Sequence, residues 1–254
     1  MKILKKISYL AGTVLLFGAL LLWNSFHHLT YFVITSTLLL YALTVLILLA
    51  RRIAWKEVLS FVAPSGLFLI SSLIFFSLID HPLVRVIFLI LVTIGYFMEL
   101  DNLYIYLYET EKYQPYALEN VHGYVNLTSL YLLVSSLYGL LLYFNWPSWI
   151  VIIFVFFLTV FFAWRTLISY KVDKSKSRIY IFISGLLLAE SALIVNFLPT
   201  SYLFNGLVLA IIYYFLINFL RDYLRDMLDK KALVKYSVIS GSAMLISILT
   251  TRWF

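Results

Sequence analysis

One group of polar residues in this chain includes carboxylate and imidazole side chains, which can bind and transfer protons. They come from three successive apolar runs: Glu99, Asp101, His122, Asn126 and Arg165. His122 and Asn126 are four residues apart and share a helix face. All five are expected near the inner end of a helix bundle, as a working polar pocket or as a structural network that joins helix ends. Ionisable groups inside a membrane are costly and tend to mark function.

Glu190 is a second candidate, because it stands inside the apolar run "IYIFISGLLLAESALIVNFL", near its middle. A bare carboxylate there costs several kcal/mol, so we expect it to be protonated or hydrogen-bonded. The expected partners are residues at similar depth: Ser135, Ser136, Tyr213 and Tyr214. A proton-carrying role and an interhelical hydrogen bond both fit these residues.

A third group of polar residues stands between apolar runs on the outer side: His27, His28, Asp80 and His81. Zinc uses such ligands, but consecutive histidines point apart in a helix and no pair has the i, i+4 spacing. We therefore expect no metal here, and "SLIDHPLVRV" at residues 77–86 is interpreted as a turn outside the membrane. Without cysteine there is no thiolate metal site either.

Catalytic motifs give no further candidate. The sequence has no histidine box, H-E-x-x-H, Walker lysine loop or aspartate-rich diphosphate motif, and membrane enzymes that modify lipids generally need such clusters. We therefore name no catalytic residue and no cofactor, and an enzyme is the least favoured class.

The elements that position these residues are membrane helices. The 254 residues are 63% hydrophobic and 12% charged, whereas a soluble domain is about 25% charged. Runs of about 20 apolar residues suffice to cross a bilayer. The sequence predicts an all-α polytopic bundle of nine spans, with eight as the alternative, near 7–23, 30–50, 58–79, 83–100, 121–143, 148–168, 179–198, 202–220 and 237–251. They form four hairpins with short outer turns, plus a final helix, within a single domain, 1–254.

Charge placement predicts the orientation. With the N-terminus in the cytoplasm, 17 of the 19 lysines and arginines fall on the inner side, as the positive-inside rule requires. We expect a multi-pass protein of the plasma membrane with an uncleaved first span and an extracytoplasmic C-terminus. This placement accounts for the net charge of +7 without nucleic acid as a partner.

The helix ends and connectors carry more detailed expectations. Prolines mark three helix starts, and Asp80 and Asn145 are expected to cap two of them. Cytoplasmic connectors are predicted at 101–120 and 221–236. The latter has an amphipathic helical pattern with an Asp226–Lys230 pair, and it is either an extension of the eighth span or a helix on the inner membrane surface. Whether the fourth helix stops near residue 100 or continues to 108 is open. Close helix packing is expected at two sets of small residues: Gly185, Ala189, Ala192 and Asn196, and Ser240 to Ala243.

The segments "LTTRWF" and "PYALENVHGYVNL" and the hairpin layout resemble uncharacterised multispan membrane proteins predicted from genomes of uncultivated bacteria. The resemblance implies a membrane helix bundle and carries no activity. The minimal loops favour a non-catalytic membrane subunit or scaffold, with membrane lipids and another membrane protein as partners. The alternatives are a small-molecule or lipid transporter, proton-linked through Glu190, and a membrane-embedded lipid-modifying enzyme. Pro64 to Gly66 is the one hint of the helix break that carriers use.

Overall fold

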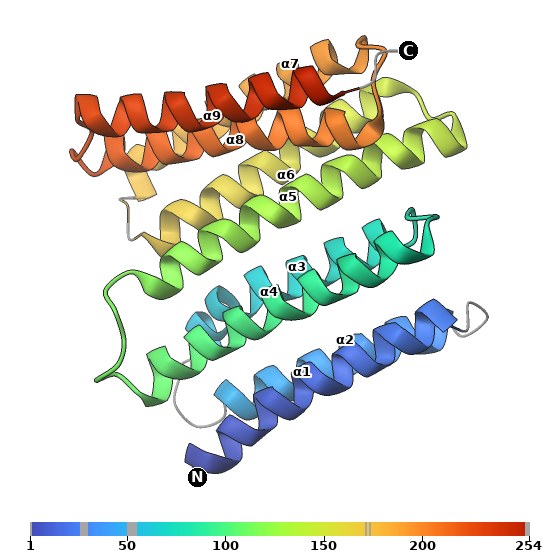
Figure 1. Ribbon diagram of the computed structural model, residues 1–254. Coiled ribbons are helices and arrows are strands. Elements are labelled where there is room, and N and C mark those ends of the chain that lie inside the picture. The colour runs from blue at the N-terminus through green and yellow to red at the C-terminus, as the bar shows by residue number, and fades with distance from the viewer. Residues whose placement is uncertain (1, 26–29, 50–54, 171, 173, 252–254) are drawn as a thin grey trace. The chain divides into compact units, whose positions relative to one another are not determined.

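The computed structural model describes residues 2–25, 30–49, 55–170, 172 and 174–251. Within these ranges every regular element is an α-helix (Figure 1). The helices in chain order are α1 (Lys2–Ser25), α2 (Thr30–Leu49), α3 (Trp55–Phe76), α4 (Pro82–Tyr108), α5 (Ala117–Phe144), α6 (Ser148–Ser169), α7 (Lys174–Asn196), α8 (Tyr202–Leu224) and α9 (Lys230–Thr250). The predicted all-α architecture is confirmed for the described residues.

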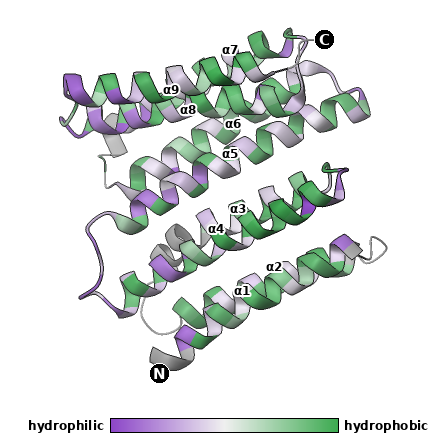
Figure 2. Ribbon diagram, in the orientation of Figure 1, coloured by the Kyte–Doolittle hydropathy of each residue, from purple (hydrophilic) through white to green (hydrophobic). Residues whose placement is uncertain are grey.

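Eight of these helices are long and apolar enough to cross a membrane, as a multi-pass protein requires. Figure 2 shows apolar residues along the helices and hydrophilic ones concentrated towards many of their ends. In α3 the described apolar stretch, Ala63–Phe76, is shorter than a full span. A lipid-embedded backbone must satisfy its own hydrogen bonds, which is why apolar runs of this length form helices.

The helices pack into two compact units. The N-terminal unit is Met1–Val125 and the C-terminal unit is Asn126–Phe254. The first turns of α5 thus belong to the N-terminal unit, and the rest of that helix belongs to the C-terminal unit.

In the N-terminal unit, α1 packs along α2 and α4, and α3 packs on α4. Small residues permit the closest approach: a Cβ added to Gly12 of α1 would lie 2.5 Å from Thr44 Oγ1 of α2. Aromatic contacts fill the remaining space, and the rings of Trp23 and Phe76 lie 4.7 Å apart. This packing brings the polar residues of α2, α3 and α4 into the interior of the unit.

In the C-terminal unit, α6 and α7 form the most extensive helix pair, and α8 packs on α7 and α9. A Cβ on Gly185 would lie 2.6 Å from Val160 of α6, and Ala189 and Ala192 are buried, so the small-residue face of α7 packs as expected. The expectation for α9 is wrong at Gly241, because an added Cβ would meet no atom within 4 Å.

Both predicted helix caps are wrong. Pro82 does begin α4, where its missing N–H costs nothing, but the N-cap is His81, which makes no side-chain capping bond. Asn145 lies outside α6 with a positive φ of 52°, and Pro147 is the N-cap. In the same turn, Arg85 Nε donates to the carbonyl of Ile79, just beyond the end of α3. Among the N-caps that the structure describes, Ser201 of α8 and Asp229 of α9 make side-chain capping bonds.

Helix α4 runs unbroken to Tyr108, so Glu99 and Asp101 lie well inside it. Within the predicted connector 101–120, only residues 109–116 lie between helices. Within the predicted connector 221–236, only residues 225–229 do. Asp226 has a φ of 55° and stands in a turn, so the helical Asp226–Lys230 pair is not formed. Helix α3 continues through Pro64, so the suggested break at Pro64 to Gly66 does not end it.

Candidate functional site

The N-terminal unit contains a buried acid–base pair. Glu99 of α4 is 1% exposed and His122, in the second turn of α5, is 4% exposed. His122 Nε2 lies 3.7 Å from Glu99 Oε1. This distance is beyond hydrogen-bonding range but well within the range of strong electrostatic interaction in a low-dielectric interior. The structure thus brings together two of the residues singled out from the sequence.

The position of Glu99 follows from the packing of α4. The buried residues of that helix recur at intervals of three and four: Leu89, Val92, Tyr96, Glu99, Leu100, Leu103, Tyr104 and Tyr108. Such spacing describes one helix face. Glu99 occupies a core position on this face, where a hydrophobic residue is the usual choice.

A small set of hydroxyl groups accompanies the pair. Tyr41 of α2 and Tyr96 of α4 are close enough to Glu99 for electrostatic interaction. The hydroxyl of Tyr41 is 3.1 Å from Ser65 Oγ of α3. Both carboxylate oxygens of Glu99 are buried, and neither accepts a hydrogen bond from the described residues. Glu99 therefore has hydroxyl groups near it but accepts no hydrogen bond from the described residues.

Asp101 is separated from this pair by its position on α4. It stands two residues after Glu99, about 200° further round the helix, and Tyr9 of α1 donates a 2.6 Å hydrogen bond to its Oδ1. Asp101 thus links α4 to α1. The acid that was grouped with Glu99 in the sequence has a different partner.

The C-terminal unit holds the other two residues of the predicted group. Asn126 of α5 donates from Nδ2 to Thr166 Oγ1 of α6, at 3.3 Å. Arg165, the preceding residue of α6, is 5% exposed, and Tyr213 of α8 lies near Thr166. These contacts join three helices through buried polar side chains.

Glu190 lies on the exposed face of α7. It is six residues before the end of the helix, about 9 Å along the axis, and so nearer that end than the expected mid-span position. Among the described residues it has no hydrogen bond or ion pair, and none of the four expected partners bonds to it. Ser135, Ser136 and Tyr213 are buried inside the unit instead.

The sequence did not reveal a network at the junction of α8 and α9. Asp222 of α8 is 9% exposed. It accepts hydrogen bonds from Tyr236 of α9 at 2.5 Å and from its neighbour Arg221 at 2.8 Å. The Arg221 guanidinium also donates to Tyr236 and lies 4.9 Å from the centre of the Tyr170 ring. Asp222 lies in the segment predicted as an amphipathic connector, and its burial was not predicted.

Lys5, one of the basic residues expected at the cytoplasmic surface, is buried in the N-terminal unit. Its ammonium donates to the hydroxyl of Tyr108 and to the carbonyl of Leu48, at the end of α2. Tyr108 donates to the same carbonyl. Because the last carbonyls of a helix have no partner within it, these groups complete the end of α2.

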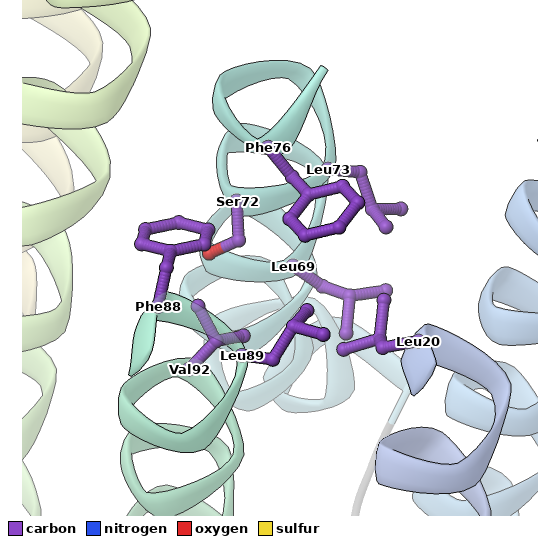
Figure 3. A pocket seen from close by; sticks show the side chains of 8 residues that line it. All are labelled: Leu20, Leu69, Ser72, Leu73, Phe76, Phe88, Leu89 and Val92. Atoms are coloured by element: carbon purple, nitrogen blue, oxygen red, sulfur yellow. The ribbon is translucent and has the colours of Figure 1, made fainter. Parts of the chain in front are cut away.

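The cavities described here do not suit a substrate. One, of about 10 Å³, is lined by residues of α1, α3 and α4 (Figure 3). It can hold at most one water molecule. Its one polar side chain, Ser72, bonds to the carbonyl of Phe68 in its own helix. A second space, of about 510 Å³, is an open groove lined entirely by apolar residues of α6, the surface expected of a lipid-facing helix.

The outer residues give no metal site in the described part of the chain. Asp80 and His81 are exposed, and His27 and His28 lie outside the described residues. No group of three histidine, aspartate or glutamate side chains is arranged to hold a metal ion among the residues described.

Comparison with known proteins identifies a family but no activity. A family model described as "Protein of unknown function (DUF5656)" matches residues 64–250. No curated protein and no solved structure matches the chain. The match covers most of the chain, from the middle of α3 to the end of α9, and includes Glu99, His122 and Glu190. The chain therefore belongs to the family of proteins of unknown function called DUF5656.

Proposed function

We propose that this protein is a non-catalytic membrane subunit or scaffold that joins another membrane protein through the exposed face of α7. The observation that carries the proposal is the position of Glu190. A carboxylate stands on the outside of a candidate membrane span, where lipid chains offer it no hydrogen-bond donor.

The surroundings of Glu190 make this position unusual. From Ile179 to the end of α7 the other exposed large side chains are apolar: Ile179, Phe182, Ile183, Leu186, Leu187, Leu193 and Ile194. A helix face that met only lipid would gain nothing from one acid among them, and the acid costs several kcal/mol. A partner helix with a cationic or hydrogen-bond-donating side chain opposite Glu190 removes that cost. We therefore assign the docking partner as a membrane helix of this chemistry.

The orientation within the membrane is part of the proposal. The distribution of lysine and arginine supports a plasma-membrane protein with a cytoplasmic N-terminus and an extracytoplasmic C-terminus. The proposal gives Glu190 a docking role in place of a proton-carrying one, because the residue makes no hydrogen bond or ion pair with the described residues of its own chain.

The test combines photo-crosslinking with mass measurement of the protein in native lipid particles. A crosslinking residue at Leu187 or Ile194, on the face of Glu190, should capture one defined protein at stoichiometric yield. The same residue at Val238 of α9, which is also exposed, should capture lipid. The variants Glu190→Leu and Glu190→Lys should lose the partner, whereas Glu111→Gln in the exposed loop before α5 should retain it.

Three results would contradict the proposal. Particles that contain one copy of the chain and no other protein would show that it is not a subunit. Particles with two copies joined through α7 would replace the partner with a second copy of this chain. A partner retained by both Glu190 variants would show that α7 is not the docking face.

A further inference from the structure

We propose that Glu99 and His122 together form a proton-binding site that holds one shared proton at neutral pH. The inference goes beyond docking by α7, because it concerns buried residues of the N-terminal unit. It is carried by burial of both side chains, the 3.7 Å contact and the lack of hydrogen bonds to the Glu99 oxygens from the described residues.

Net charge determines how many protons the site holds. With one proton, the pair is either carboxylate and imidazolium or carboxylic acid and neutral imidazole, and its net charge is zero in both forms. Loss of that proton leaves one buried negative charge, and gain of a second leaves one buried positive charge. Each charged form is disfavoured in an interior that water does not reach. The two groups therefore titrate as a pair and not as independent residues.

The other titratable and charged groups of the packed elements do not replace this proton. Among the described side chains they are Lys5, Lys6 and Tyr9 on α1, Tyr41 on α2, Arg85, Tyr96, Asp101, Tyr104, Tyr106 and Tyr108 on α4, and Glu119 and Tyr124 on the part of α5 that belongs to this unit. Lys5 donates to Tyr108, Asp101 accepts from Tyr9, and Glu119 accepts from Tyr113. The described side chains of α3, from Ala63 onward, include no ionisable group.

A proton is also the ligand that fits the packing. Glu99 is flanked on its helix face by buried Tyr96, Leu100 and Leu103. A metal ion or an ammonium group would need space and several oxygen ligands, whereas a proton needs no cavity. Tyr41 and Tyr96 are close enough to interact electrostatically with Glu99.

The experiment counts the protons on the pair in the full-length protein in lipid nanodiscs at about pH 7. The chain has four histidines, so nitrogen-15 NMR of labelled histidine, assigned with His122→Gln, distinguishes imidazolium from neutral imidazole. Infrared spectra, compared with those of Glu99→Gln, report whether Glu99 is a carboxylic acid or a carboxylate. The expected result is one proton: either the imidazolium or the acid, but not both.

Any other proton count on the Glu99–His122 pair would contradict the proposal. A carboxylate with a neutral imidazole, or an acid with an imidazolium, would overturn the proposal. In Glu99→Gln the proton should be lost and His122 should be neutral, and Glu99→Asp should restore the one-proton count. An imidazolium that persists in Glu99→Gln would also overturn it. Glu190→Gln is the matched control and should leave the histidine spectrum unchanged. If Glu99→Gln does not fold, NMR of the wild type and infrared spectra with labelled glutamate still give the count.

Discussion

Ser135 of α5 and Gly206 of α8 are in such close contact that a side chain at Gly206 has no space. A Cβ atom added there would overlap the Ser135 hydroxyl and would lie 2.9 Å from the Ser135 backbone nitrogen. The backbone of α8 at Gly206 therefore packs directly against the side chain of Ser135 on α5. Small residues permit this kind of approach in membrane proteins.

Gly206→Ala should destabilise the protein by about 1–3 kcal/mol, the usual cost of overpacking. Part of the clash is with backbone, so rotation of a side chain cannot relieve it. Thermal unfolding in nanodiscs gives the measurement, and Gly241→Ala, at a site with no atom within 4 Å, should be neutral or stabilising. Ser135→Gly should rescue Gly206→Ala in part. An unchanged midpoint in Gly206→Ala would show that the helices are further apart.

Tyr236→Phe should weaken the packing of α9 on α8. Tyr236 and Ser247 are the buried residues of this helix, so the bond from Tyr236 to the Asp222 carboxylate is a large part of its attachment. A hydrogen bond to a charged group contributes about 1.5–3 kcal/mol. Amide hydrogen exchange in residues 230–250 should become roughly tenfold faster or more. Tyr143→Phe, at a residue that is 77% exposed, should leave exchange in α9 unchanged, and equal exchange in the two variants would argue against the role of Tyr236.

The helices could be predicted from the sequence, but their ends could not. Hydropathy identifies residues that favour lipid, and in lipid those residues must be helical. It does not detect helix that continues into polar sequence. For this reason the sequence left the end of α4 open between residues 100 and 108, and it placed the start of the last helix at 237, whereas α4 ends at Tyr108 and α9 begins at Lys230.

The candidate site was predictable in its residues but not in its pairing. In a soluble protein the polar face of a helix points outward, whereas lipid is as apolar as the interior and removes that distinction. Glu99 and Glu190 therefore looked alike in sequence, although one is buried and the other exposed. The three- and four-residue spacing of Glu99 with Tyr96 and Leu103 was the one signal of its burial.

The effects of substituting Glu99 and His122 on stability should be less than additive. His122→Leu leaves a buried carboxylate without its partner, and loss of one partner of a buried ion pair typically costs about 3–5 kcal/mol. Glu99→Leu with His122→Leu removes both groups, so the double variant should be more stable than the sum of the single effects predicts. Unfolding free energies of the three variants in nanodiscs provide the cycle. Additive effects would mean that the two side chains do not interact.

Stability at high pH should depend on Tyr113, in the loop between α4 and α5. Burial, and then its 2.8 Å hydrogen bond to Glu119, raise the pKa of Tyr113 to about 12. Because this pKa is above the ordinary value of 10.0, the protonated hydroxyl stabilises the folded loop fully below about pH 10, and that contribution is lost as the pH rises through about 12. The difference in phenolate absorbance between the wild type and Tyr113→Phe isolates this one titration. Its midpoint should be near pH 12 and should fall in Glu119→Gln, whereas a midpoint near 10 in the wild type would show that the hydroxyl is neither buried nor bonded.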